Sequence, residues 1–65
     1  MKERLEHALH ENGELMVLTD SGEEHELHKH NCEFHDDGFI EIDAAEKVHW
    51  LNCEKIERYW IHKEF

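Results

Sequence analysis

Proline is absent from this chain of 65 residues, glycine occurs only three times, and no apolar run approaches the roughly 20 residues needed to cross a bilayer. The sequence also lacks internal repeats and low-complexity tracts. We therefore expect one soluble domain over 1–65, with no linker and no membrane partner. A domain of this length buries only roughly 60% of its unfolded surface, so its core must be small.

Residues that usually perform catalysis are also scarce. Ser21 is the only serine and has no GxSxG context, and no glycine-rich phosphate-binding loop occurs. The adjacent acids Glu23-Glu24 and Asp36-Asp37 lie in predicted turns, and so short a chain has little room for a desolvated cleft. We expect a protein that is not an enzyme and needs no cofactor.

Cysteine occurs only twice, at Cys32 and Cys53. The pair is sufficient for one disulfide, but no apolar leader directs the chain to an oxidising compartment. Free cysteine commonly serves as a small buried apolar residue. We expect two free thiols and a cytoplasmic location.

Basic side chains are few and unevenly placed. The chain has 17 acidic and 7 basic residues, a formal net charge of -10 at neutral pH. Positions 14–43 contain ten acids and one base, Lys29, whereas positions 44–65 contain four of each. An acidic surface repels phosphate over about 8 Å at physiological salt, which argues against a general nucleic-acid-binding face. A simpler interpretation is that the acids keep a small protein in solution.

An apolar stripe at helical spacing predicts an α-helix over 1–12. The members of the stripe are Met1, Leu5, Ala8 and Leu9. Gly13 follows, and glycine readily adopts the left-handed conformation that ends a helix. A helix of about three turns is not stable alone, so we expect it to dock on a sheet.

The remaining sequence predicts five short antiparallel strands. Their expected bounds are about 14–19, 23–35, 38–43, 47–52 and 55–62. Turn signals separate them at Gly22, at Gly38 and within the polar segment 52–55. The stretch 47–65 organises the fold, because it holds both tryptophans and the only tyrosine.

Alternation within the strands predicts which side chains face the core. Leu27 is out of phase with Cys32 and Phe34, so we expect a bulge or sharp bend that turns all three inward. Trp60 is expected on the outer side of its strand. The first strand is apolar on both sides, formed by Leu15 and Val17 and by Met16 and Leu18. The later inward side chains are predicted to be Ile40, Ile42, Val48, Trp50, Ile56, Tyr59 and Ile61, with Leu51 as a further candidate.

Three segments carry a recognisable order of strands and turns: LMVLTDSG, EFHDDGFIEI and VHWLNCEKIERYWI. They read as a first strand with its turn, the end of a bent strand leading into a third strand, and two final strands. This order resembles the Sm and Hfq family of small barrels. The resemblance implies a mainly β fold in which an N-terminal α-helix precedes a five-stranded, strongly bent antiparallel SH3-like or Sm-like barrel. It also implies that several copies close into a ring through strands four and five.

Sm-like proteins that bind RNA hold a base with residues after the acidic turn and between the last two strands. At those places this chain offers Phe39 to stack a base and Asn52 to hydrogen-bond one. The residues that a ring would present to RNA or to a protein partner are Phe39, Asn52, Lys55, Arg58 and Trp60.

Three function classes follow from these features. We favour a non-enzymatic, oligomer-forming protein-interaction or assembly module, with Trp60 and Phe65 as exposed aromatics and with free strand edges that bind further copies or an unknown protein. The second class is an RNA-binding Sm-like protein. The third is an inhibitor that imitates nucleic acid toward a basic partner. Its acidic face would consist of Glu23, Glu24, Glu26, Glu33, Asp36 and Asp37.

Eight histidines raise the question of a metal site. On an unbroken strand His28, His30 and Cys32 would share a face and offer three ligands to Zn²⁺ or Ni²⁺. The expected bend would separate them, and His49 with Cys53 is only a pair, so no metal site is predicted. Histidines among acids can instead make the oligomeric state depend on pH. The favoured interpretation is that they are passive surface residues.

Overall fold

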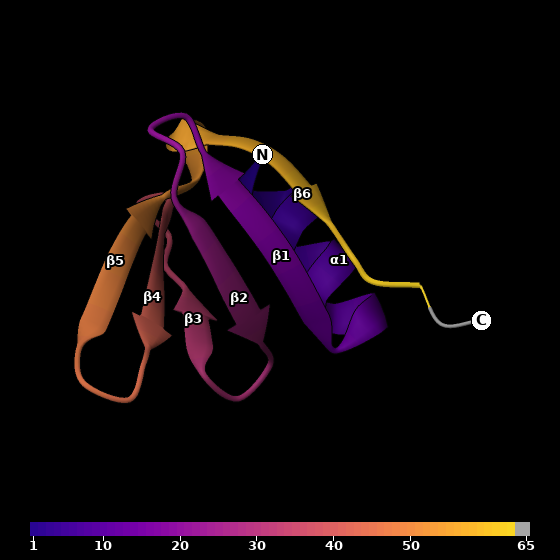
Figure 1. Cartoon of the computed structure of the whole chain (residues 1–65), viewed down its shortest axis with the longest axis horizontal. Helices are drawn as coiled ribbons and strands as arrows, with labels where there is room; N and C mark the ends of the chain where they lie inside the picture. The colour runs from indigo at the N-terminus through magenta and orange to yellow at the C-terminus, as the bar shows by residue number, and fades with distance from the viewer. Residues whose placement is uncertain (64–65) are drawn as a thin grey trace.

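The computed structural model describes residues 1–63 and shows one helix followed by short antiparallel strands (Figure 1). The elements are α1 (Lys2–Asn12), β1 (Glu14–Thr19), β2 (Glu24–His28), β3 (Cys32–Phe34), β4 (Phe39–Asp43), β5 (Val48–Asn52), the 3-10 helix η1 (Cys53–Lys55) and β6 (Ile56–Trp60). The strands form two three-stranded sheets, sheet A in the order β2-β1-β6 and sheet B in the order β3-β4-β5. A mainly β fold behind an N-terminal helix is therefore confirmed.

The strand predicted over 23–35 is two strands. β2 ends at His28 in sheet A, β3 begins at Cys32 in sheet B, and a turn joins them. Because sheets A and B share no strand pairing within residues 1–63, the closed five-stranded barrel is not confirmed. The described chain has six strands in two sheets instead.

Hydrogen bonds around Asn31 hold the turn between β2 and β3. The His28 amide donates to Asn31 Oδ1 (2.8 Å), and the Asn31 amide donates to the His28 carbonyl (3.2 Å). The Cys32 thiol donates to the same carbonyl (3.1 Å), and the Asp43 amide of β4 donates to the Asn31 carbonyl (2.7 Å). These bonds fix the direction in which the chain leaves sheet A and enters sheet B.

The turn also settles which side chains face the core. Leu27 is fully buried, and Cys32 and Phe34 pack against the core from the other sheet, as predicted. Two leucines of α1 join them, whereas Met1 of the predicted stripe is 46% exposed. The buried core consists of Leu5, Leu9, Leu15, Val17, Leu27, Ile40, Ile42, Leu51, Cys53 and Ile56.

The predicted helix end and turns are present. Gly13 ends α1 with a φ of 81°, and its amide donates to the Leu9 carbonyl (2.8 Å). At the start of η1, Asn52 Oδ1 accepts a hydrogen bond from the Glu54 amide (3.0 Å).

The helices in the described part of the chain, residues 1–63, include none with the length and apolar character that a membrane span requires.

The prediction of which β5 side chains face the core is wrong, because the inward positions are shifted by one residue. Val48 and Trp50 were expected inside, but they are 41% and 61% exposed, whereas Leu51 is 8% exposed. The register with β4 explains the difference, because Leu51 lies opposite the buried Ile40. Cross-strand partners share a face of the sheet, so Val48 and Trp50 must point outward.

β6 ends earlier than predicted. Tyr59 lies opposite the buried Val17 and packs against the core, but the strand stops at Trp60. Ile61, expected inside, is 40% exposed, because no strand pairing holds it over the core. Phe65, predicted as an exposed aromatic, lies outside the described residues.

Two histidines lie where the inner faces of the sheets meet. His25 of β2 and His49 of β5 contact edge to face, with ring centroids 5.2 Å apart. Nε2 of His25 is buried without a hydrogen-bond partner in the described chain, and Glu23 Oε1 lies 3.6 Å from it. A buried polar atom without a partner is destabilising.

We predict that His25→Phe raises the free energy of unfolding by about 1 kcal/mol at pH 8, because it keeps an aromatic ring against His49 and removes the unpartnered nitrogen. Urea denaturation measures the change. His30→Phe, at an exposed turn position, serves as the control and should leave stability nearly unchanged. A loss of stability in His25→Phe would contradict the prediction.

Candidate functional site

The outer face of sheet B carries two exposed aromatic side chains. They are Phe39 of β4, which is 37% exposed, and Trp50 of β5, which is 61% exposed. Phe39 lies opposite Asn52, and Trp50 lies opposite Glu41. The two rings are therefore diagonal neighbours on one face, a spacing that aromatic side chains can reach across.

A hollow of about 320 Å³ opens at these rings and is lined by Phe39, Trp50, His35 and Asp37. The turn between β3 and β4 supplies the last two residues. In this turn Gly38 has a φ of 89°, and its amide donates to the His35 carbonyl (3.2 Å). Asp37 Oδ1 accepts a hydrogen bond from the Phe39 amide (3.1 Å). The turn thus holds an imidazole and a carboxylate beside the aromatic rings.

Further carboxylates lie around the hollow. Nε2 of His35 is 3.0 Å from Glu41 Oε1, and its Nδ1 is 3.8 Å from Glu33 Oε2. Within residues 1–63, no lysine or arginine lines the hollow. Aromatic rings surrounded by acids form a surface that attracts organic cations.

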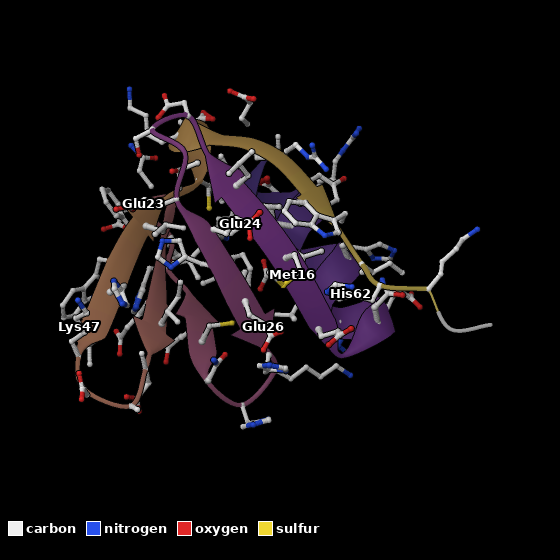
Figure 2. All side chains as sticks on the ribbon, viewed as in Figure 1. Met16, Glu23, Glu24, Glu26, Lys47 and His62 are labelled. Carbon is white, nitrogen blue, oxygen red and sulfur yellow. The ribbon has the colours of Figure 1, made fainter. Side chains whose placement is uncertain are left out.

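Sheet A presents a different aromatic surface. The guanidinium carbon of Arg58 lies 4.7 Å from the centroid of the Trp60 ring. Met16 and Leu18 of β1 lie opposite these two residues and are half-buried; Figure 2 shows Met16 on this side of β1. The Trp60 ring is therefore covered in part by a cation of its own chain.

The residues predicted to contact RNA or a partner fall into separate groups. Phe39 and Asn52 are directly opposite each other in sheet B, but the Asn52 side-chain oxygen already caps η1. Arg58 and Trp60 stack on sheet A, and the exposed Lys55 ends η1. The structure thus brings Phe39 beside Asn52 and Arg58 beside Trp60. It does not join the five predicted residues in one site.

All six residues of the predicted acidic face are exposed, yet they are spread over several elements. Glu23 comes directly before β2, Glu24 begins the strand, and Glu26 lies farther along it (Figure 2). Glu33 belongs to β3 in the other sheet, and the two aspartates lie in the turn that follows it. Negative charge therefore extends from sheet A to the hollow on sheet B.

The His28, His30 and Cys32 set does not form a metal-ligand cluster. His28 Nε2 is 2.9 Å from Glu26 Oε1, the rings of His28 and His30 stack with centroids 5.8 Å apart, and the Cys32 thiol bonds to a backbone carbonyl. Groups of three metal-ligating side chains are absent from residues 1–63. His49 contacts His25.

Sequence reasoning missed His35 and misplaced Trp50. Trp50 could have been assigned to the surface if Leu51, rather than the larger ring, had been aligned with the buried isoleucines of β4. His35 carried no comparable signal, because its position depends on the hydrogen bonds that fold the turn after β3. Asp37 and Phe39 were identified, but as parts of different surfaces.

Both cysteines are free thiols in the structure. Burial raises the pKa of the Cys53 thiol above its ordinary value of 9.0 and raises that of Cys32 in the same direction. The folded state thus keeps thiol protons that the unfolded chain loses as pH rises past 9.0, so these two thiols contribute a fall in the free energy of unfolding as pH rises through that range.

We predict that Cys53→Ala shows a smaller fall in the free energy of unfolding between pH 8 and pH 10 than the unchanged protein. Urea denaturation at both pH values gives the comparison. Iodoacetamide should also modify Cys53 slowly at pH 8 until denaturant is added. Rapid modification of the native protein would contradict the burial of this thiol.

No protein-family model, curated protein or solved structure matches the chain significantly. The resemblance to Sm-like proteins remains an expectation from the order of strands and turns.

Proposed function

We propose that this protein is a non-enzymatic assembly module in which copies of the chain join through the edges of β5 and β6. The observation that carries the proposal is the composition of β5. This strand, Val48–Asn52, contains no Asp, Glu, Lys or Arg and pairs only with β4 in the described chain. An uncharged edge strand readily pairs with another chain.

The other strand edges favour the same arrangement. β2 and β3 also lie at sheet edges, but they carry Glu24, Glu26 and Glu33, so copies would repel one another there. β6 carries one acid and one base, Glu57 and Arg58. Pairing β5 of one copy with β6 of the next therefore avoids repulsion between like charges.

The arrangement of the two strands suits a ring. Figure 1 shows β5 and β6 diverging from η1 toward opposite sides of the fold. A contact between two different surfaces generates a ring when its rotation closes. If β2 and β3 are counted as one bent strand, the order β5-β4-β3/β2-β1-β6 supports the Sm-like barrel that the resemblance implies. The free thiols agree with a cytoplasmic location.

Light scattering during size-exclusion chromatography tests the assembly. We predict a particle of roughly five to seven copies, the size that the resemblance to Sm-like rings implies, because a contact between two different surfaces can close into a ring. A monomer at high protein concentration would contradict the proposal.

The edge itself can be tested with Val48→Lys. We predict that this variant shifts the protein toward the monomer, because a lysine on an edge strand opposes pairing with another strand. Ala45→Lys introduces the same charge in the exposed loop before β5 and should assemble normally. Equal effects of the two substitutions would show that added charge, and not the edge, controls assembly.

RNA binding is the runner-up, and the separation of Asn52 from Arg58 and Trp60 does not favour it. We predict that labelled U-rich and A-rich RNA show no mobility shift at physiological salt, because the acidic surface repels phosphate. A shift that persists at twice that salt concentration would favour the Sm-like RNA-binding alternative.

A further inference from the structure

We propose that the hollow formed by Phe39, Trp50, His35 and Asp37, called here the aromatic hollow, binds a cationic side chain of a basic protein partner. The ligand chemistry is a guanidinium or alkylammonium group, as in arginine or lysine. The proposal rests on the protein-interaction role proposed above, but it does not depend on self-assembly.

The aromatic rings of the hollow favour a cationic ligand. Trp50 is 61% exposed, and a cation over the face of tryptophan is attracted by its ring electrons more strongly than over any other side chain. Within residues 1–63, the one cation–π contact is that of Arg58 with Trp60. Trp60 thus receives its cation from its own chain, whereas the more exposed Trp50 remains available to another molecule.

The negative charge around the aromatic hollow favours the same ligand. Asp37 lines it, and His35 holds Glu41 at 3.0 Å and Glu33 at 3.8 Å. Carboxylates beside an aromatic face add a direct attraction for a cation and strengthen its preference over a neutral group. The charge around the hollow is therefore complementary to a positive ligand.

Two lysines of the same chain, Lys2 and Lys47, do not fill this place. Lys2 borders a neighbouring hollow with Asp37 but pairs with Glu6 at 3.8 Å. Lys47 lies at the opposite end of β5 from Asn52, at the tip of the hairpin (Figure 2). Neither side chain lines the aromatic hollow.

The same charges disfavour a nucleotide as the ligand. An exposed tryptophan and phenylalanine could stack a base, but the phosphates would then approach Asp37 and its neighbouring glutamates without a compensating lysine or arginine. A basic polypeptide meets attraction from both the rings and the carboxylates. The favoured ligand is therefore a protein and not a nucleic acid.

Edge-to-edge assembly leaves the aromatic hollow open. Pairing through β5 uses its backbone, whereas Trp50 and Phe39 project from the face of sheet B. Each copy in an assembly would present its own site. Several weak sites on one particle would increase the overall affinity for a partner with repeated basic residues.

Three peptides of identical length that carry arginine, trimethyl-lysine or citrulline at one central position test the proposal. Citrulline has nearly the shape of arginine without its charge. Titration into ¹⁵N-labelled protein should shift the Trp50 indole and Phe39 amide signals with the first two peptides and leave them unchanged with the third. The relative sizes of the shifts with the arginine and trimethyl-lysine peptides show whether the hollow prefers a guanidinium or an alkylammonium group.

Substitutions locate the binding. Trp50→Leu should weaken binding of the arginine peptide by about fivefold or more, and Asp37→Asn should weaken this binding to a smaller extent. Trp60→Leu is the matched control and should bind like the unchanged protein. Because Trp50 is mostly exposed, its variant should fold, which signal dispersion in the amide spectrum verifies.

Several results would overturn the proposal. They are equal binding of citrulline and arginine, equal loss of affinity in Trp50→Leu and Trp60→Leu, or shifts confined to Glu24 and Glu26 on sheet A. Larger shifts of the Trp50 and Phe39 signals with a uridine oligonucleotide than with the arginine peptide would also contradict it. Ring formation without peptide binding would reject this site and leave the assembly proposal intact, and a peptide-binding monomer would do the reverse.

Discussion

The rest of the structure depends on the bend centred on Asn31. Its side chain and backbone bond to His28 on one side and to Asp43 on the other, so the chain leaves sheet A and enters sheet B in a fixed direction. The bend changes the phase of the strand, which lets Leu27 and Phe34 contribute to one core. Without the bend, either Leu27 or Phe34 would face water. The lost burial of apolar surface would weaken a domain with so small a core.

The bend also determines where the surface aromatics lie. β3 pairs with β4, and β4 sets the register of β5, so the inward position of Ile40 and Ile42 forces Leu51 inward and Trp50 outward. The same sheet therefore has an apolar inner face and an aromatic, acid-bordered outer face. The edge strand of this sheet, β5, contains no Asp, Glu, Lys or Arg. The proposed assembly would use the edge of β5, and the proposed cation site would use the outer face of the same sheet.

Much of this arrangement could be predicted from local sequence. Gly13 and Gly38 marked a helix end and a turn, and the phase conflict between Leu27 and Phe34 indicated the bend. The sequence could not show that the bend divides one strand between two sheets, because that depends on the hydrogen bonds of Asn31. It also suggested that Trp50 is buried, since size and apolarity favour the core when the register is unknown. The aromatic hollow was missed for this reason, and the exposure of Trp50 is a consequence of pairing rather than of composition.

A two-dimensional NOE spectrum of the protein tests the central role of the bend most directly. The account predicts contacts between the ring protons of His25 and His49, whose centroids are 5.2 Å apart. It also predicts cross-strand contacts of His28 with Glu14 and of Phe34 with Ile40. A strand that runs unbroken through Asn31, with β1 as its partner along the whole length and no contact between the two histidine rings, would contradict it.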